Sequence, residues 1–447
     1  QSNPYFLFPE LYNFRYNIFS SEWPVANRVI ELYLQKKSEN GGWERQINGI
    51  SNNEKAVLLL EKRTFKELLV DMELRNLQNN IVGQEASRLF ARAEINMGVE
   101  AFRDSLYSLL KRNTFLNIKF ENMLDTLGEI SRTDIRSLLG EWEKTTPLPF
   151  YSLGEPTLTK ITNKGGEEFF VLKMLISNNS DYDGIIHMDI RKDGWWYQPL
   201  EDPRAKTKIE MPAHTSKEFV SVWEDQIRNV EINTMVSGNL PNIISQDINN
   251  VKQERNKIVK DSIYILPESS FDLPGEIIVD NEDSTLFILS APPIVGLLPK
   301  WLDEVEETPF KYSGISWWRP PLQWTATTND RYYGKYIRSA FVIKSGDGSQ
   351  TATWKVPVPE VGQYDLYYHV FKDDELRWNN NLQGEYHFKV KYGSEVEDAY
   401  VNLRKANEGW EQLGSYYFDS DTIRVVLTDE CKLRSVTADA VKIVKRY

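Results

Sequence analysis

Apolar residues recur at helical spacing through roughly the first 150 residues of the chain. One such stretch begins at Ser51-x-x-Glu54, a capping-box pattern, and continues through an apolar stripe: Val57, Leu58, Phe65, Leu68, Leu69 and Met72. Gly98 interrupts a second helical stretch, and the last one ends before Pro147 and Pro149, where proline cannot continue a helix. The pattern predicts an all-α segment over residues 1–150.

From about residue 151 the period of the pattern changes from 3.6 to 2. Short apolar runs such as 169–176, 185–190 and 219–222 are separated by Gly, Pro, Asn and Asp. Strands of this length and spacing are typical of a small antiparallel β-sandwich, which we place at residues 151–245. Residues 246–270 are polar and helix-capable, and are predicted to be a linker or a short bridging helix.

Residues 271–447 return to a strand pattern with more aromatic residues. Alternating runs at 352–358 and 364–370 precede closing runs at 423–427 and 438–444. Their number and length predict a second, jelly-roll β-sandwich. The fold class expected is therefore multidomain α + β: an N-terminal all-α domain, a small antiparallel β-sandwich, and a larger β-sandwich.

Charge and composition exclude several classes of function. The chain has 53 Lys and Arg against 65 Asp and Glu, a formal net charge of −12, which makes nucleic acid an unfavourable partner. A single cysteine, Cys431, rules out a disulfide framework, and no two of the four histidines have the spacing of a His-Glu-x-x-His zinc site. No apolar run is long enough for a membrane span, and no nucleophile elbow or P-loop is present. No cofactor is expected.

Acidic residues cluster at 280–283, and the sequence leaves three interpretations open. Asp280 and Asp283 are candidate ligands of Ca²⁺, which prefers oxygen atoms. The same cluster, or the acidic residues at 373–375, has the side chains that a glycosidase needs. The third interpretation is a solvated acidic turn.

Aromatic residues gather in a proline-broken stretch near the start of the last domain. Sugar rings stack on exposed indole and phenol rings, so these residues are candidates for a glycan-binding platform. The alternative is that they close one end of the sandwich or pack on the preceding domain, because tryptophan is usually largely buried. The candidate ligand-binding residues are Trp317, Trp318, Trp324, Tyr332, Tyr333 and Trp378.

Several motifs of the last domain resemble a golvesin C-terminal-like domain. They are VDNEDSTLF, then YYGKYIRSAFVIKSGDGSQTATWKVPVPEVGQYDLYYHV, GWEQLGSYYFDSDTIRVVLTDE and SVTADAVKIVK, in an order and spacing that cover about 276–445. That family is similar to the domain appended to xanthan lyases and cell-wall amidases. The resemblance implies a galactose-binding-like β-sandwich that binds polysaccharide. The insert KDDELRWNNNLQ, at 372–383, departs from the family pattern.

The preceding segments resemble the end of the catalytic region of gluzincin zinc aminopeptidases. The motifs are MGVEAFRDSLYSLLKRNTF, FENMLDTLGEISRTDIRSLLGEWEKTTPLPFY and, at 232–243, INTMVSGNLPNI. The zinc-bearing helix and its Glu ligand are not in this chain. The position of the family's transition-state tyrosine falls near Gly83, and no tyrosine occurs between Tyr33 and Tyr107. The resemblance implies a peptidase half upstream of Gln1 or a loss of that chemistry.

These observations predict a non-catalytic region of an aminopeptidase-like protein of the cell envelope, outside the cytoplasm. Its expected partners are a polysaccharide or peptidoglycan and the upstream part of its own parent protein. A structural scaffold that braces an upstream catalytic or membrane region is one alternative. A glycosidase that uses an acidic pair is another.

Overall fold

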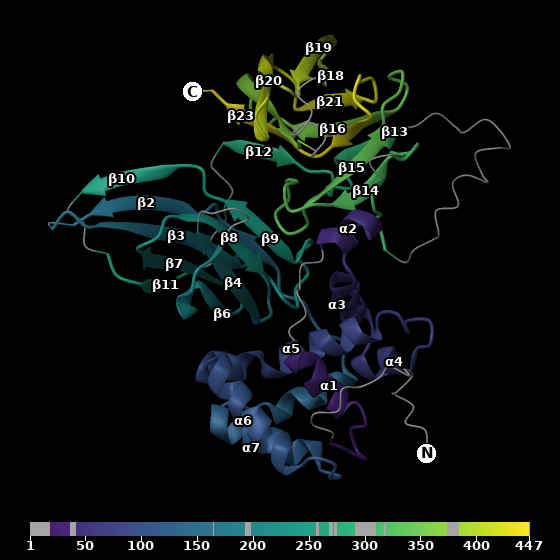
Figure 1. Cartoon of the computed structure of the whole chain (residues 1–447). Helices are drawn as coiled ribbons and strands as arrows, with labels where there is room; N and C mark the ends of the chain where they lie inside the picture. The colour runs from purple at the N-terminus through teal and green to yellow at the C-terminus, as the bar shows by residue number, and fades with distance from the viewer. Residues whose placement is uncertain are drawn as a thin grey trace. The chain divides into compact units, whose positions relative to one another are not determined.

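The computed structural model divides the chain into two compact units, each described by itself (Figure 1). The helix–sandwich unit comprises Gln1–Asn40 and Asn52–Ser270, and the C-terminal unit comprises Gly41–Ser51 and Phe271–Tyr447. The structure describes residues 18–35, 42–163, 165–192, 198–255, 259–267, 271, 275–290, 310–316, 319–372 and 384–446, without the side chains of Gly42, Trp43 and Arg255.

Helices form the first part of the helix–sandwich unit, as the apolar spacing predicts. They are α1 (Ala26–Leu34), α3 (Asn52–Lys62), α4 (Phe65–Val70), α5 (Gln78–Met97), α6 (Val99–Arg112), α7 (Phe120–Ser131) and the 3-10 helix η1 (Arg136–Glu143). Their apolar stripes meet in one core around Phe90, Phe102 and Trp142, which are almost fully buried. Gly98 separates α5 from α6 with a φ of +82°, a backbone conformation that favours glycine.

The predicted stripe from Val57 to Met72 is divided between two helices. Helix α3 ends at Lys62, and α4 starts with a complete capping box in which the Glu67 N–H donates to Thr64 Oγ1 at 3.2 Å. The last residue of the stripe, Met72, lies beyond α4 and is 59% exposed. Glu54, from the predicted capping box, is buried, and its carboxylate accepts the backbone N–H of Asn242 at 2.8 Å.

A β-sandwich completes this unit. Its strands are β1 (Tyr151–Leu153), β2 (Thr157–Thr162), β3 (Glu168–Asn178), β4 (Gly184–Lys192), β5 (Gln198–Pro199), β6 (Lys206–Met211), β7 (Thr215–Trp223), β8 (Ile227–Asn233), β9 (Ile243–Asp247), β10 (Val251–Arg255) and β11 (Ser262–Pro267), with the short 3-10 helix η2 (Pro203–Ala205). One sheet has the order β10-β2-β3-β7-β11, with β1 on β3, and the other has the order β5-β4-β8-β9, with β6 on β4. The predicted α-then-β order is confirmed.

Residues 246–270 are a correction to the sequence-based prediction. Instead of a linker or bridging helix, they contain two edge strands of the first sheet. Strand β10 pairs in parallel with β2, and β11 pairs antiparallel with β7. Because β2 and β7 present free backbone hydrogen-bonding edges, pairing overrides the helix propensity of a polar stretch. Three consecutive residues of β11, Ile263, Tyr264 and Ile265, are more than half exposed.

A buried polar cluster joins the helices to the sandwich within this unit. Glu94 of α5 is 4% exposed, accepts the Tyr33 hydroxyl at 2.7 Å, and forms an ion pair with Lys208 of β6. Burial and the Glu94 charge raise the pKa of Tyr33. The pairing gives the buried Glu94 carboxylate an opposite charge, the Lys208 ammonium, whose side chain is partly exposed.

The C-terminal unit is a second β-sandwich, joined by one helix from early in the chain. Its elements are α2 (Gly42–Asn48), β12 (Glu276–Val279), β13 (Phe287–Ser290), β14 (Thr325–Thr328), β15 (Ser339–Lys344), β16 (Thr351–Pro357), β17 (Gly362–Val370), β18 (Glu385–Tyr392), β19 (Glu395–Asn402), β20 (Gly409–Phe418), β21 (Thr422–Thr428), β22 (Ser435–Ala438) and β23 (Val441–Lys445). One sheet has the order β12-β23-β17-β20, the second β13-β16-β21-β18-β19 and the third β14-β15-β22. The predicted run at 438–444 is divided between β22 and β23.

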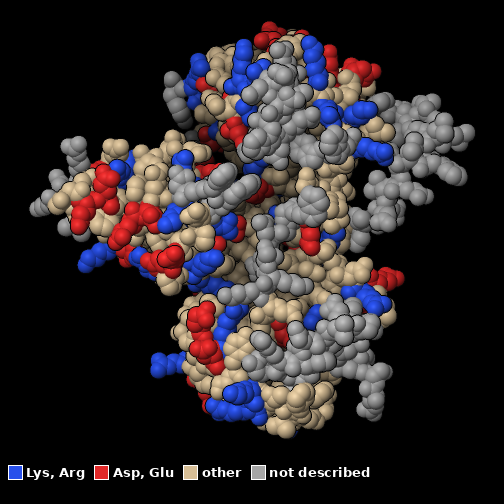
Figure 2. Space-filling model, in the orientation of Figure 1, with Lys and Arg blue, Asp and Glu red and all other residues tan. Residues whose placement is uncertain are grey.

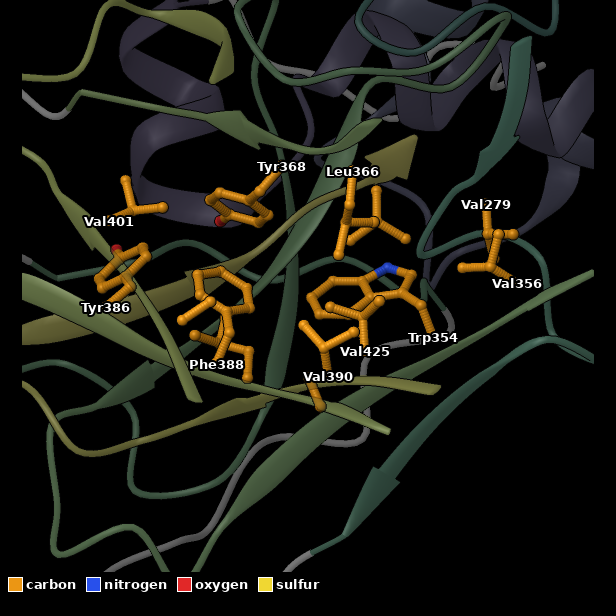
Figure 3. Close-up of a cluster of buried hydrophobic side chains, with 14 of the residues drawn as sticks. Val279, Trp354, Val356, Leu366, Tyr368, Tyr386, Phe388, Val390, Val401 and Val425 are labelled. Atoms are coloured by element: carbon orange, nitrogen blue, oxygen red, sulfur yellow. The ribbon is translucent and has the colours of Figure 1, made fainter. Parts of the chain in front are cut away.

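The core of this unit lies between the two larger sheets (Figure 3). Trp354 of β16, Tyr368 of β17 and Phe388 of β18 are fully buried, and the Tyr368 and Phe388 ring centroids are 4.9 Å apart. Burying a side chain of this size contributes roughly 2–3 kcal/mol. Alternate residues of each strand supply the core, so the remaining residues face outward.

Helix α2 and the turn after it pack on the C-terminal unit, although the sequence places residues 1–150 in one helical domain. Thr328 Oγ1 of β14 donates to the Gly49 carbonyl at 2.6 Å. Gly49 has a φ of +80°, and a Cβ there would lie 2.4 Å from the Ser313 backbone. Glycine is therefore required at residue 49, both for the turn and for the close approach. The next residue, Ile50, is fully buried.

Candidate functional site

The outer face of the sheet β12-β23-β17-β20 carries a group of aromatic and charged side chains. Strand β17 alternates, so that Leu366 and Tyr368 point into the core while Tyr367 and His369 point outward. Cross-strand pairing places Trp410 of β20 opposite His369. We call Tyr333, Tyr367, His369, Trp410 and Lys442 the aromatic platform.

Ring contacts hold the platform together. The centroids of His369 and Trp410 are 5.1 Å apart at 77°, an edge-to-face arrangement. Tyr333, from the loop between β14 and β15, contacts Trp410 at 5.0 Å and His369 at 5.8 Å. Each of these residues remains partly exposed. A loop and two strands therefore bring three partly exposed rings into contact.

A buried carboxylate supports the platform from below. Asp439, between β22 and β23, has no exposed surface and lies 2.8 Å from Nδ1 of His369 through Oδ2. Both of its oxygens accept the backbone N–H of Tyr333 at 3.2 Å. Burial raises the pKa of the Asp439 carboxyl, and the neighbouring His369 opposes that rise. The Asp439 carboxylate thus holds His369 by its imidazole ring and Tyr333 by its backbone N–H.

Lys442 of β23 gives the platform a charged edge. Its Nζ lies 4.9 Å from the Trp410 ring centroid and 5.4 Å from that of Tyr367, distances typical of cation–π contacts. The same ammonium pairs with Glu276 of β12 at 2.9 Å. Gln412, which is opposite Tyr367 on β20, is exposed. Partly exposed rings, an ammonium, a carboxylate and an amide therefore lie together on this face of the sheet.

The structure brings one of the sequence-predicted residues, Tyr333, into this platform. Tyr332 is a correction: it is 6% exposed and packs on Phe371 at 4.6 Å, so its ring face is not available to a ligand. Trp324 is partly buried against the sandwich core, and its stacking role stays a prediction. Trp317, Trp318 and Trp378 lie outside the described residues.

The acidic turn at 280–283 is held by its own hydrogen bonds. Asp283 Oδ2 accepts the backbone N–H of Asp280 at 2.8 Å, and Glu282 accepts the Tyr312 hydroxyl at 3.0 Å and pairs with Lys311 at 2.6 Å. Burial, followed by the nearby charge of Asp439, raises the pKa of Asp280 well above its ordinary value. Asp439, the first of the charged neighbours of Asp280, is fully buried, and Glu282 and Asp283 are the others. The acidic residues at 373–375 lie outside the described residues.

Two features of the described residues bear on the remaining chemistry. Within the part of the chain that the structure describes, no group of three or more His, Cys, Asp or Glu side chains has an arrangement that could hold a metal ion. The calcium role of Asp280 and Asp283 stays a prediction. No described helix combines the length and apolar character that crossing a membrane requires.

Sequence reasoning missed Tyr367, His369, Trp410 and Lys442 as parts of one site. Their contacts depend on the pairing of β17 with β20 and β23, which brings together residues more than 30 positions apart. The register between β17 and β20 also shifts by one residue at Leu366 and Tyr367. The outward positions of the alternating run 364–370 were the one available signal.

Comparison with protein families gives one match. Residues 320–445 match the family model of the golvesin C-terminal domain, and the platform lies inside this range. The golvesin resemblance is confirmed for these residues, while the aminopeptidase resemblance stays a prediction. No curated protein matches the chain.

Solved structures give distant likenesses. A carbohydrate-binding module, TmCBM61 in complex with β-1,4-galactotriose, is 15% identical, covers 27% of this chain and 77% of its own, and has a TM-score of 0.16. A β-glucuronidase from Bacteroides uniformis is 12% identical, covers 69% of this chain and 31% of its own, and has a TM-score of 0.19. Values this low establish no shared function.

Proposed function

We propose that the C-terminal unit binds polysaccharide through the aromatic platform. The observation that carries the proposal is the contact of Tyr333, His369 and Trp410 above the buried Asp439. Partly exposed aromatic rings leave apolar surface in contact with water, and the apolar C–H face of a sugar can cover that surface. The golvesin match of residues 320–445 is consistent with this role.

The platform also has the polar groups that sugar recognition needs. Lys442 and Glu276, which pair with each other, supply a donor and an acceptor, and exposed Gln412 supplies its amide oxygen while its Nε2 donates to Asp365 and Ser415. Because Asp439 and the strand pairing already hold the His369 and Tyr333 rings, binding loses little side-chain entropy. A rigid, partly apolar surface with hydrogen-bonding groups at its edge favours a neutral glycan.

The test is retention of the full chain on insoluble peptidoglycan and its affinity for soluble β-1,4-galactan, with wild type compared with Trp410→Ala. We expect the variant to lose at least tenfold in affinity, about 1.4 kcal/mol, which is typical of a tryptophan anchor in an interface.

The matched control is Tyr417→Ala. Tyr417 is 59% exposed on the same strand, β20, and lies opposite Gln363 at the far end of β17. It should bind as wild type does. Equal losses in both variants, or no binding of either glycan by wild type, would refute the platform.

The helix–sandwich unit is proposed to be the non-catalytic tail of an aminopeptidase-like protein of the cell envelope, outside the cytoplasm. Motif order from α6 through η1 into β1 supports this context, and Gly83 stands near the position of the family's tyrosine. Hydrolysis of a panel of aminoacyl p-nitroanilides with added Zn²⁺ should stay at the blank rate. Zinc-dependent turnover that survives repurification would overturn the proposal.

The scaffold role stays as a second candidate, because Tyr332 and Trp324 are used in packing. It predicts that no glycan is retained. The glycosidase alternative stays a prediction: Asp439 near Asp280 has no exposed surface, and the acidic residues at 373–375 lie outside the described residues. Release of reducing ends from a polysaccharide panel would revive it.

A further inference from the structure

Three cations stand side by side on the outer face of the other large sheet of the C-terminal unit. In the pairing of β16, β21 and β18, Lys355 lies opposite Arg424, and Arg424 lies opposite Lys391. Their strand neighbours Val356, Val425 and Val390 are buried, so the three charged residues are on the solvent side. We call Lys355, Arg424 and Lys391 the cationic row.

The cationic row has no acidic partner among the described residues. Lys391 and Arg424 are exposed and Lys355 is partly exposed. On β19, Glu395 and Glu397 flank Val396, the residue opposite Lys391, and Glu397 accepts the Tyr392 hydroxyl. On the outward face of β19 the nearest acid is Asp398, which is opposite Lys389, two residues along β18 from Lys391, and its carboxylate lies 2.7 Å from Nε2 of His387. Like charges directly opposite each other destabilise a sheet. Figure 2 shows where basic and acidic side chains lie on one face of the molecule.

The spacing and chemistry of the row fit a polymer with regularly placed carboxylates. Neighbouring strands are about 4.8 Å apart, so the row spans roughly 10 Å in one direction. A polysaccharide with one carboxylate on each sugar presents charges at a similar interval. The central residue is Arg424, whose planar guanidinium binds a carboxylate through two parallel hydrogen bonds.

A second feature of the same face favours a glycan over other polyanions. Tyr400 of β19 is 59% exposed and stacks on His387, with ring centroids 4.8 Å apart and planes at 8°. Tyr400 is opposite His387, four residues along β18 from Lys391, which is roughly 13 Å along the strand. Its exposed ring offers a stacking surface for a sugar on the same face. Nucleic acid is opposed by the net charge of −12.

We propose that the cationic row, together with Tyr400 further along the same face, is a second binding surface, for a uronate-containing polysaccharide. It rests on the proposed function only in taking a polysaccharide as the ligand, because it lies on a different sheet from the aromatic platform. Each carboxylate on the row replaces like-charge repulsion by an ion pair, so binding is expected to weaken steeply with salt.

The experiment measures binding of the full chain to sodium polygalacturonate at low and high salt. The row variant is Lys355→Gln, Arg424→Gln and Lys391→Gln together. The control variant has the same charge change at exposed cations elsewhere in the unit: Lys344→Gln, Arg404→Gln and Lys405→Gln. We expect the row variant to lose at least tenfold in affinity and the control less than threefold.

Two further comparisons separate the proposal from non-specific attraction. Fully methyl-esterified polygalacturonate has the same sugar without the charge and should not bind through the row. Tyr400→Ala should weaken polygalacturonate binding without changing its salt dependence. Equal losses in the row and control variants, equal binding of the esterified polymer, or equal binding of DNA and anionic vesicles would overturn the proposal.

The outcomes for the two surfaces are distinguishable. If Trp410→Ala abolishes binding of neutral galactan while polygalacturonate binding persists, the two surfaces act separately, as proposed. If neutral galactan never binds but polygalacturonate binds through the row, the platform fails and the row stands. If the row variant binds polygalacturonate as wild type does, the row fails, whatever galactan does.

Discussion

Removing the central charge of the cationic row should stabilise the C-terminal unit. Arg424 has a like charge opposite it on both neighbouring strands, Lys355 and Lys391. With the charged ends splayed to about 7 Å, each pair repels by about 0.6 kcal/mol in a water-like dielectric. Screening at physiological salt reduces this to about 0.25 kcal/mol for each pair. Arg424→Gln should therefore add about 0.5 kcal/mol at 0.15 M salt and about 1 kcal/mol in dilute buffer.

The measurement is calorimetric melting of wild type and Arg424→Gln in 10 mM and 500 mM salt. For a unit of this size, 1 kcal/mol corresponds to roughly 2–4 °C, so the gain is measurable in dilute buffer and should disappear at high salt. Arg404→Gln, which removes an exposed cation outside the row, is the control and should not change Tm. A lower Tm for Arg424→Gln in dilute buffer, or a gain that does not depend on salt, would show that the row is not repulsive.

Four other predictions follow from buried groups. Burial, and next the charge of Lys208, lowers the pKa of His187 below its ordinary 6.5, so the unfolded chain binds a proton there that the folded chain does not. Stability present above pH 6.5 should therefore fall as pH drops below it, and urea unfolding of His187→Gln should depend less on pH. Glu94→Gln removes the buried carboxylate charge that pairs with Lys208 and should cost about 3 kcal/mol, measured by urea unfolding; a cost below 0.5 kcal/mol would contradict the pairing argument. Trp354→Ala should destabilise the C-terminal unit by about 3–5 kcal/mol, and a cost near zero in thermal melts would show that the core relaxes. Burial raises the pKa of the Cys431 thiol, so iodoacetamide at pH 8 should label it slowly until the chain is denatured; rapid labelling of the native chain would refute this.

Regular patterns made much of the fold predictable from the sequence. The apolar run 169–176 became β3 and the alternating run 364–370 became β17, because burial on one or both faces of a sheet dictates such patterns. Strands β10 and β11 were not predictable in this way. They are edge strands, exposed over much of their length, so their state depends on pairing with β2 and β7 and not on local apolar period.

The candidate sites were harder to predict than the fold, for a related reason. Tyr333 was recognisable as an aromatic residue in a loop, but nothing local indicates that it meets Trp410, 77 residues later. The cationic row is likewise absent from the linear sequence, since Lys355, Lys391 and Arg424 are adjacent only through strand register. Tyr332 and Tyr333 are neighbours of the same residue type, yet Tyr332 is buried and Tyr333 is partly exposed. The sequence alone does not distinguish them.

The place of α2 in the C-terminal unit has a consequence for the order of synthesis. Residues 41–51 leave the ribosome about 220 residues before residue 271, where the rest of their unit begins. Ile50 and the Gly49 turn must therefore wait, without their β-sheet neighbours, while the whole helix–sandwich unit is made. An expression fragment that starts at residue 271 omits this helix and loses the packing of Ile50 and the hydrogen bond to the Gly49 carbonyl. Adding residues 41–51 in trans as a peptide should restore these contacts.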